Sequence, residues 1–194
     1  MANAVSPWVE EGSMSVRTIV TVTGSVVLVV ALVAVGSYLW SRRSPHVIEA
    51  TSEIRATPAE VWQVLVDNDR YPEWNPAITR SEGRLEVGGT VTNTVRLGDG
   101  TMTFTPEVLA VRPGRELRWV GRTYLPRVAD GEHSFVLEEI HPGVTRLTQR
   151  EEFTGVIVPF ASGLLAGMDE EFAAVNAALA RRVEAVRGSV GAGR

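Results

Sequence analysis

Residues 160–186, FASGLLAGMDEEFAAVNAALARRVEAV, decide the fold class of this chain. Apolar residues recur through this stretch at steps of three and four, which is the spacing of one face of an α-helix. Charged residues such as Glu170, Glu171 and Arg181 fall on the other side, so we expect one long amphipathic helix. Its apolar face comprises Phe160, Leu164, Leu165, Met168, Phe172, Val175, Leu179, Val183 and Val186. A helix of this length needs a large apolar partner surface.

Three residues interrupt the pattern of this helix. Gly163 and Gly167 lower the helix propensity near its start, and close approach of a strand or a ligand would explain them. Asn176 breaks the apolar face between Phe172 and Leu179. We consider two placements for its amide. It lies at the edge of the stripe, reaching solvent or a backbone carbonyl, or it points into a cavity.

The composition excludes several kinds of chemistry. The chain has 194 residues, of which 44% are hydrophobic and 22% charged, as expected for a globular domain with an appendage. Its net charge is −4 and the acidic excess lies in residues 44–194, so nucleic acid is not an expected partner. The chain has no cysteine, which excludes disulfides, thiol catalysis and thiolate metal sites. All basic residues are arginine, so a lysine Schiff base is excluded as well.

Residues 18–40 form an uncharged run of 23 residues. A helix of that length is about 34 Å long and can cross a hydrocarbon layer of about 30 Å. Tyr38 and Trp40 stand where an interfacial aromatic belt is expected, and Arg42 and Arg43 follow directly. A cleaved signal peptide is the alternative, but its apolar region is usually shorter and its charge precedes that region. We therefore predict an uncleaved transmembrane helix.

The charges on the two sides of this run predict its orientation. Arg42 and Arg43 outweigh Arg17, which follows two glutamates, so the positive-inside rule places the C-terminal domain in the cytoplasm. We expect a single-pass protein of the cell membrane. Its predicted parts are an N-terminal tail (1–17), the transmembrane helix (18–40), a linker (41–45), a folded domain (46–187) and a disordered C-terminal tail (188–194).

The folded domain is predicted to begin with a strand over residues 46–55 and a helix. Thr57, Pro58 and Glu60 mark the helix start, because Thr-x-x-Glu is a capping box and proline suits the first helical position. From Ala77 onward the apolar period is two, and six further strands are predicted at residues 78–87, 90–97, 101–111, 115–122, 132–140 and 144–153. Successive hairpins imply an antiparallel sheet of about seven strands, and the flanking helices make the class α+β.

The strand faces predicted to cover the long helix mix apolar and polar residues. They comprise Phe104, Val108, Leu117, Trp119, His133, Phe135, Leu137, Leu147, Gln149, Glu151 and Phe153. A dry core does not readily hold an unpaired charge such as that of Glu151. Either the polar residues lie at an open rim, or the sheet encloses a hydrated cavity with polar groups, as a ligand pocket does.

His133 and Glu151 are the candidates for proton chemistry. If the turn between their strands centres on Pro142, the two residues face each other across neighbouring strands. A His–Glu pair in a cavity can act as a general acid and base. It can equally orient a ligand, or serve as a structural ion pair, and the sequence leaves these three roles open.

Several motifs together resemble the SRPBCC superfamily, the START and birch-allergen-like helix-grip group that includes bacterial polyketide cyclase/dehydrase-type proteins. The matching segments are residues 54–62, 71–76, 117–119, 131–135, 151–155 and 176–179, and the similarity covers residues 46–187. The resemblance implies an antiparallel sheet that wraps the C-terminal helix, with an apolar cavity between them. It leaves the N-terminal helix outside the fold.

We expect a membrane-tethered domain that binds a small hydrophobic ligand, such as a lipid, an isoprenoid or a polyketide, rather than an enzyme. The expected ligand-binding residues are Phe104, Leu117, Trp119, His133, Phe135, Gln149, Glu151, Met168, Phe172 and Asn176. No metal or cofactor motif is visible, and neither is expected. One alternative is a cyclase/dehydratase-type enzyme that uses His133 and Glu151 as catalytic residues. Another is a protein-interaction module with a vestigial pocket.

Overall fold

The computed structural model of the chain describes residues 15–192 except Asp99, Tyr124, Ser162 and Leu164. The chain divides into two compact units, Met1–Gly36 and Ser37–Arg194. The first unit consists, in its described part, of most of one helix. The second holds two β-sheets and the remaining helices.

Helix α1 (Val16–Arg43) is the one helix in the described part of the chain that is long and apolar enough to span a membrane. It runs three residues beyond the predicted span, into the first part of the segment expected to be a linker. Ser44 ends it, because the residue before a proline is disfavoured in the α conformation. A signal sequence near the N-terminus can meet the same criteria of length and composition.

The strands form two antiparallel sheets, which confirms the α+β class but corrects the single sheet of seven strands. The larger sheet has the order β1 (His46–Ile54), β8 (Val144–Thr154), β7 (Ala129–His141), β6 (Glu116–Thr123) and β5 (Glu107–Arg112). The smaller sheet has the order β2 (Ile78–Gly83), β3 (Val91–Leu97) and β4 (Gly100–Phe104). The predicted strand over 101–111 is divided at Pro106, which has no N–H for a ladder hydrogen bond. A bridge between Thr90 and Glu107 joins the two sheets.

Short helices follow β1. Helix α2 (Pro58–Leu65) begins with the predicted capping box, in which Thr57 N donates to Glu60 Oε2 at 2.7 Å and Glu60 N donates to Thr57 Oγ1 at 3.4 Å. The hydrogen bonds that Thr57 donates to this carboxylate from its backbone N–H and its hydroxyl lower the pKa of Glu60. A 3₁₀ turn, η1 (Asn68–Arg70), and the short helix α3 (Tyr71–Trp74) occupy the segment that the prolines restrict.

Helix α4 (Met168–Ala192) starts later than the sequence pattern indicated. Gly167 has φ +85°, a left-handed conformation that ends the preceding loop and that side chains disfavour. Phe160 belongs instead to a 3₁₀ turn, η2 (Val158–Phe160), and Leu165 to a loop, so the predicted helix start is wrong by two turns. At its other end α4 continues to Ala192, past the predicted boundary of the domain. Leu164 lies outside the described residues.

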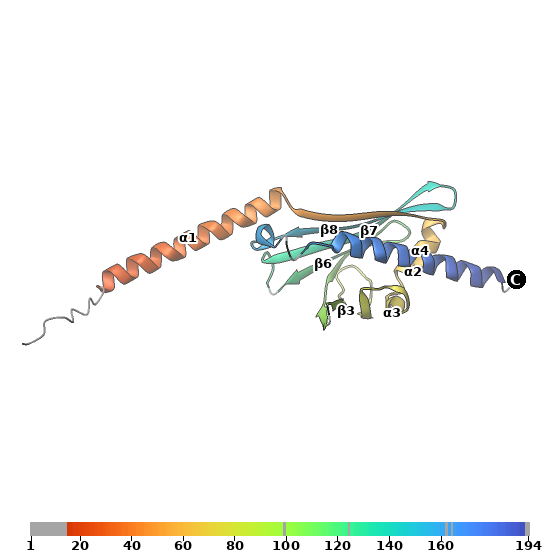
Figure 1. Cartoon of the computed structure of the whole chain (residues 1–194), viewed down its shortest axis with the longest axis horizontal. Coiled ribbons are helices and arrows are strands. Elements are labelled where there is room, and N and C mark those ends of the chain that lie inside the picture. Colours follow the sequence, from red (N-terminus) through yellow and green to blue (C-terminus); the bar gives the residue numbers. More distant parts are fainter. Residues whose placement is uncertain (1–14, 99, 124, 162, 164, 193–194) are drawn as a thin grey trace, which may run out of the picture. The chain divides into compact units, whose positions relative to one another are not determined.

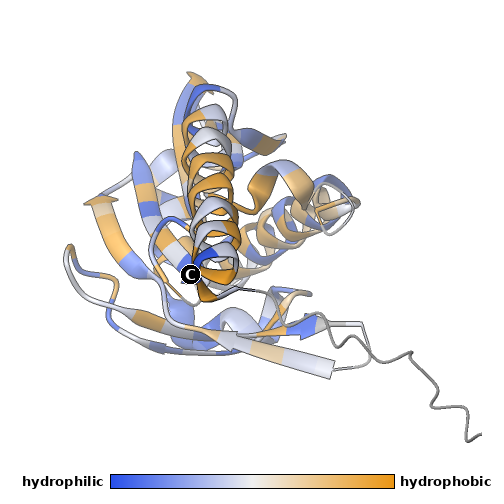
Figure 2. Cartoon of the chain, turned by 90° about the vertical axis from the view of Figure 1, so that its left-hand side faces the viewer, coloured by the Kyte–Doolittle hydropathy of each residue, from blue (hydrophilic) through white to orange (hydrophobic). Residues whose placement is uncertain are grey.

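The core lies where α4 and α2 cover the inner face of the five-stranded sheet (Figure 1). Hydrophobic and hydrophilic residues alternate along the strands (Figure 2), so one face of the sheet is apolar. The core cluster contains Ile54, Ala56, Val61, Val64, Leu65, Leu117, Trp119, Phe135, Leu137, Leu147, Leu179 and Val183. Trp62 packs against this cluster and is half-buried.

Truncating Leu179 should therefore destabilise the folded unit. Its side chain is fully buried, so Leu179→Ala leaves a cavity beneath α4 and should cost about 2–5 kcal/mol of unfolding free energy. The measurement is denaturant unfolding of the full chain in detergent, followed by tryptophan fluorescence. Val186→Ala on the same helix is the control, because Val186 is exposed and its loss should cost much less. Equal unfolding midpoints for the two variants would contradict the assignment of Leu179 to the core.

Candidate functional site

The pairing of β7 with β8 brings His133 opposite Glu151, which confirms the predicted register. The hydrogen bond between His133 Nδ1 and Glu151 Oε2 is 3.2 Å long. Both side chains are largely buried, with 12% and 17% of their surface exposed. The two groups are therefore withdrawn from bulk water and already in hydrogen-bond contact, on the sheet face that α4 covers.

This register depends on one extra residue in β7. Next to the two-residue loop Pro142-Gly143, His141 pairs with Val144. If that register continued along the strands, His133 would face Glu152. The register shifts by one residue between Glu139 and His141, and below this bulge His133 faces Glu151. A shift of one residue turns every side chain to the other face of the sheet. The bulge therefore puts the Glu151 carboxylate, rather than that of Glu152, next to the imidazole.

Aromatic rings enclose the His133 imidazole. Trp119 stacks on it at a centroid distance of 5.2 Å and an interplanar angle of 12°. Phe135 lies 4.8 Å and Phe172 5.1 Å from it, both tilted. Trp119 and Phe135 come from neighbouring positions on the sheet and Phe172 comes from α4. The imidazole is thus held in an apolar box between sheet and helix, with polar contacts only at its two nitrogens.

Gln149 contacts the second nitrogen of the ring. Gln149 Nε2 lies 3.2 Å from His133 Nε2. Since a carboxylate accepts only and an amide nitrogen donates only, this geometry fits a neutral ring that donates from Nδ1 to Glu151 and accepts at Nε2 from Gln149. Gln149 is buried, and its Oε1 has no hydrogen-bond partner among the described residues. The amide therefore presents a free acceptor inside the domain.

Asn176 presents a second free acceptor nearby. Its Nδ2 donates to the backbone carbonyl of Ala50 at 3.0 Å, and Ala50 pairs with Gln149 across β1 and β8. Of the two placements considered for this amide, the backbone carbonyl is the partner, but the side chain is fully buried rather than at a wet edge. Its Oδ1 finds no donor in the part of the chain that the structure describes. Buried acceptors without donors are rare in folded proteins and point to a ligand or a water.

Gly131 makes room for the Glu151 carboxylate, a role that the sequence analysis missed. A Cβ atom on Gly131 would lie 2.5 Å from Glu151 Oε1 and 3.1 Å from the ring of Phe153. Gly121, directly across the ladder in β6, has no such neighbour: a Cβ there would meet its nearest heavy atom at 4.0 Å. A glycine inside a strand is the sequence signal for such a close approach.

The remaining predicted ligand residues are placed differently. Leu117 is fully buried in the core cluster. Met168 is the first residue of α4 and is half-buried. Phe104 ends β4 and pairs with Asn93, so it lies in the three-stranded sheet rather than with His133. The structure thus brings six of the ten predicted residues together around the imidazole: Trp119, His133, Phe135, Gln149, Glu151 and Phe172.

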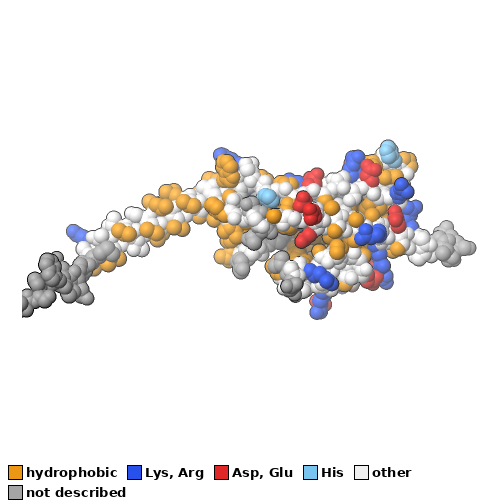
Figure 3. Space-filling model, viewed as in Figure 1, with side chains coloured by type: hydrophobic (Ala, Val, Ile, Leu, Met, Phe, Trp, Pro, Cys, Tyr) orange, Lys and Arg blue, Asp and Glu red, His pale blue; other side chains and the backbone are white. Residues whose placement is uncertain are grey.

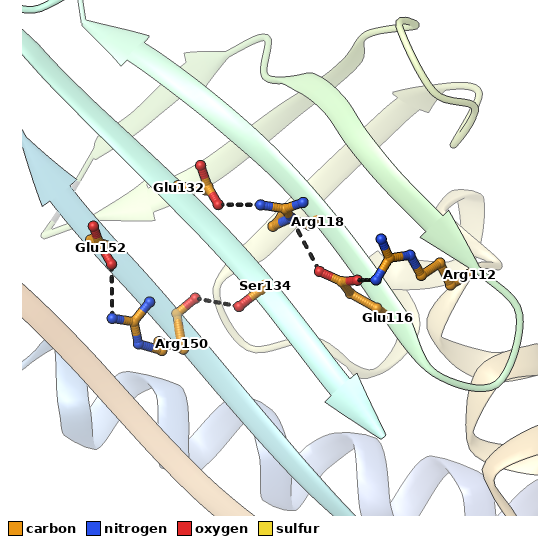
Figure 4. A network of polar contacts seen from close by, with 7 residues as sticks. All are labelled: Arg112, Glu116, Arg118, Glu132, Ser134, Arg150 and Glu152. Atoms are coloured by element: carbon orange, nitrogen blue, oxygen red, sulfur yellow. Dashed lines mark hydrogen bonds and ion pairs between the residues drawn. The ribbon is translucent and has the colours of Figure 1, made fainter. Parts of the chain in front are cut away.

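The outer face of the same sheet carries a separate network of ion pairs (Figure 4). Arg118 contacts Glu132 at 2.7 Å and Glu116 at 3.1 Å, and Arg112 contacts Glu116 at 2.8 Å. The hydrogen bond to Glu132 raises the pKa of Arg118. Each carboxylate of this network is paired with an arginine, so the network is explained without a ligand. The polar groups of the inner face are the ones that need an explanation.

No group of three or more His, Asp or Glu residues suited to a metal ion occurs in the described residues.

A family model described as polyketide cyclase/dehydrase and lipid transport matches residues 45–184. This match confirms the resemblance inferred from the motifs. The search of curated protein sequences returned no match.

Solved structures show the same fold. An aromatase/cyclase, Zhui from Streptomyces sp. R1128, superimposes with a TM-score of 0.61 at 18% identity, covering 72% of this chain and 94% of its own. A START superfamily protein from Mycobacterium smegmatis has a TM-score of 0.58 at 20% identity, covering 73% of this chain and 99% of its own. Norcoclaurine synthase from Thalictrum flavum, in complex with dopamine and hydroxybenzaldehyde, has a TM-score of 0.58 at 16% identity, covering 72% and 86%. At these identities the likeness establishes the fold.

Placing a methyl group at residue 131 should displace the Glu151 carboxylate. Gly131→Ala should break the hydrogen bond to His133, at a cost of about 0.5–1.5 kcal/mol for that bond in addition to the strain against Phe153. Gly121→Ala, across the ladder, is the matched control and should cost less. The measurement is a double-mutant cycle with Glu151→Ala in denaturant unfolding. Simple additivity of Gly131→Ala and Glu151→Ala would show that residue 131 does not act through the carboxylate.

Proposed function

Because the chain belongs to the polyketide cyclase/dehydrase and lipid transport family, we propose that its folded domain, residues 46–187, binds a small hydrophobic ligand between the five-stranded sheet and α4. The observation that carries this proposal is the enclosed imidazole of His133, with aromatic rings on its faces and polar groups at its edges. Ligand sites combine a mostly apolar lining with a few convergent polar groups, and this arrangement has both.

The free acceptors favour a particular chemistry for the ligand. Gln149 Oε1 and Asn176 Oδ1 are buried without donors among the described residues. Leaving a buried acceptor unsatisfied costs about 1–3 kcal/mol, so a ligand hydroxyl that donates to one of them would gain that energy on binding. The aromatic rings of Trp119, Phe135 and Phe172 suit a flat or extended apolar body. The proposed ligand is therefore an apolar molecule with at least one hydroxyl group, such as a lipid, an isoprenoid or a polyketide.

One observation favours an enzyme as the second candidate. His133 and Glu151 are already in hydrogen-bond contact, and a carboxylate that orients an imidazole is the arrangement of a general base. Two solved structures of the same fold are described as an aromatase/cyclase and a synthase, although their low identities relate them to this chain by fold alone. In this alternative the ligand is a substrate for a cyclase/dehydratase-type reaction. Gln149 would hold the imidazole in the tautomer that the reaction needs.

We also propose that α1 anchors the domain in the cell membrane in a single pass. Residues 18–40 carry no charge, and α1 has the length that a span requires. Arg42 and Arg43 at its end support a cytoplasmic location of the folded domain.

Two kinds of substitution separate binding from catalysis. Trp119→Ala removes a large contact surface and should weaken binding of an apolar ligand about tenfold or more, with little dependence on pH. For a pure binder, His133→Ala should change affinity by about tenfold at most, the value of one hydrogen bond. The ligand is first identified by native mass spectrometry of the detergent-extracted full chain, and its affinity for each variant is then measured by titration.

Catalysis would give a different pattern. His133→Ala and Glu151→Gln would each slow turnover of the co-purified molecule about 10²–10⁴-fold with affinity nearly unchanged. Their effects would also be non-additive, because the two groups act as one unit. That pattern would overturn the binding proposal in favour of the enzyme. Absence of any bound small molecule and of any binding to hydroxylated lipids or polyketides would contradict both.

The anchor makes a separate prediction about topology. Full-length protein should remain with membranes after a carbonate wash, while a variant lacking residues 1–40 should be released by that wash. A reporter fused after Arg194 that is active only in the cytoplasm should be active. Activity of a reporter that works only outside the cytoplasm would reverse the orientation. Release of a product that has lost its N-terminal helix would identify that helix as a cleaved signal.

A further inference from the structure

Five large apolar side chains are exposed at one end of the folded unit. We call them the apolar rim: Leu39, Trp40, Leu125, Ile157 and Phe160. Their exposed fractions range from 44% at Ile157 to 76% at Phe160. Single exposed apolar residues are common on protein surfaces, but a cluster of them marks a contact surface.

Hydrogen bonds hold the end of α1 against the segment that follows β8. Ser37 Oγ donates to the carbonyl of Val156 at 2.5 Å, and Gly155 N donates to Ser41 Oγ at 3.0 Å. Ser41 is fully buried by this contact. Trp40, one residue before it, points away and is exposed. The end of α1 is therefore part of the folded unit and carries two residues of the rim at a fixed place.

The loop between β6 and β7 lies against the same segment. Val156 N donates to the carbonyl of Arg127 at 2.9 Å, and Ile157 N donates to the carbonyl of Val128 at 3.2 Å. Val128 N in turn donates to the carbonyl of Leu125 at 3.3 Å. Residues 37–41, 125–128 and 155–160, which are far apart in sequence, thus form one continuous surface. Hydrophobic side chains lie at this end of the folded unit in Figure 3.

Burial of Val158 keeps the rim turned outward. Val158 is the first residue of η2 and is buried in the domain, while Ile157 and Phe160 on either side of it are exposed. A 3₁₀ turn places successive side chains about 120° apart, so anchoring one residue directs its neighbours away from the core. The exposure of Phe160 is therefore imposed by the local structure.

Basic side chains accompany the rim. Arg42 and Arg43 follow Trp40, and Arg127 lies in the loop beside Leu125, all three exposed. Asp130 is the acidic residue bonded to this loop, and both of its carboxylate oxygens accept from the backbone N–H of Arg127 at 3.1 Å. Apolar and aromatic side chains bordered by arginine are typical of surfaces that lie in the headgroup region of anionic membranes.

We propose that the apolar rim inserts into the interface of the lipid bilayer. The folded domain then contacts the membrane surface directly, in addition to being tethered by its anchor. The proposal rests on the proposed anchor, because Leu39 and Trp40 of the rim are among the last residues of the proposed span, 18–40. Insertion of one large apolar side chain should strengthen such a contact about tenfold to a hundredfold. Residues 155–160 also lead into the loop before α4. The membrane-contacting end of the domain is therefore close in sequence to the start of the helix that carries Phe172.

The absence of cysteine allows a direct test by single-cysteine labelling of the full chain. An environment-sensitive dye is attached at Ile157→Cys in the rim, at Met102→Cys on the three-stranded sheet, or at Val27→Cys within the proposed span. Met102 is the matched control because it is an exposed apolar residue outside the rim. Each protein is placed in nanodiscs of phosphatidylcholine and phosphatidylglycerol whose acyl chains carry a nitroxide quencher.

We expect quenching at position 157 to be severalfold stronger than at position 102, with strong quenching at position 27. Adding Leu125→Ser and Phe160→Ser to the position-157 protein should reduce its quenching toward the level of position 102. Both residues are exposed, so these changes leave the fold intact. Quenching at 27 but not at 157, or quenching at 157 that both serines leave unchanged, would overturn the insertion of the rim and leave the anchor standing. Absence of quenching at 27 would overturn the anchor and the insertion together.

Discussion

The pairing register of β7 with β8 determines which chemistry the domain contains. Side chains of a strand alternate between its two faces, so a slip of one residue exchanges the contents of the inner and outer faces. Here the bulge near Ile140 sets the register that pairs His133 with Glu151 and Glu132 with Glu152. The first pair is enclosed under α4, and the second lies in the solvated ion-pair network. The inner site and the outer network are therefore two results of the same pairing.

The inner face combines this register with the packing of α4. Phe172, Val175, Leu179 and Val183 bury one stripe of the helix against the sheet, which excludes water from the space around His133. Low access to water strengthens the hydrogen bonds of the imidazole and raises the cost of each unpaired polar atom. Asn176 lies on that same stripe, bonded to the edge strand β1. The helix thus supplies both the apolar cover and one of the two acceptors that a ligand can satisfy.

The sequence predicted those features that depend on local pattern. The capping box at Thr57, the antiparallel hairpins and the opposition of His133 to Glu151 follow from spacing, although the last needed the bulge as well as the turn. The sequence does indicate the break at Pro106 and the late start of α4 after Gly167, because proline interrupts strands and glycine weakens helices. The prediction relied instead on the apolar periodicity, which runs across both residues. The space that Gly131 leaves for Glu151 depends on a contact between strands, and the sequence alone indicates only that something approaches closely. The place of Phe104 depends on how the chain divides between two sheets, which no local pattern specifies.

The edge strand β1 has a consequence for the order of events during synthesis. β1 emerges from the ribosome directly after the N-terminal helix, but its partner β8 follows roughly 100 residues later. At about 5–20 residues per second, β1 waits for several seconds with its hydrogen-bonding groups unpaired. An unpaired strand can join a neighbouring chain during that interval. Glu49 and Glu53 are exposed on β1, and charge of this kind on an unpaired edge discourages such mispairing until β8 arrives.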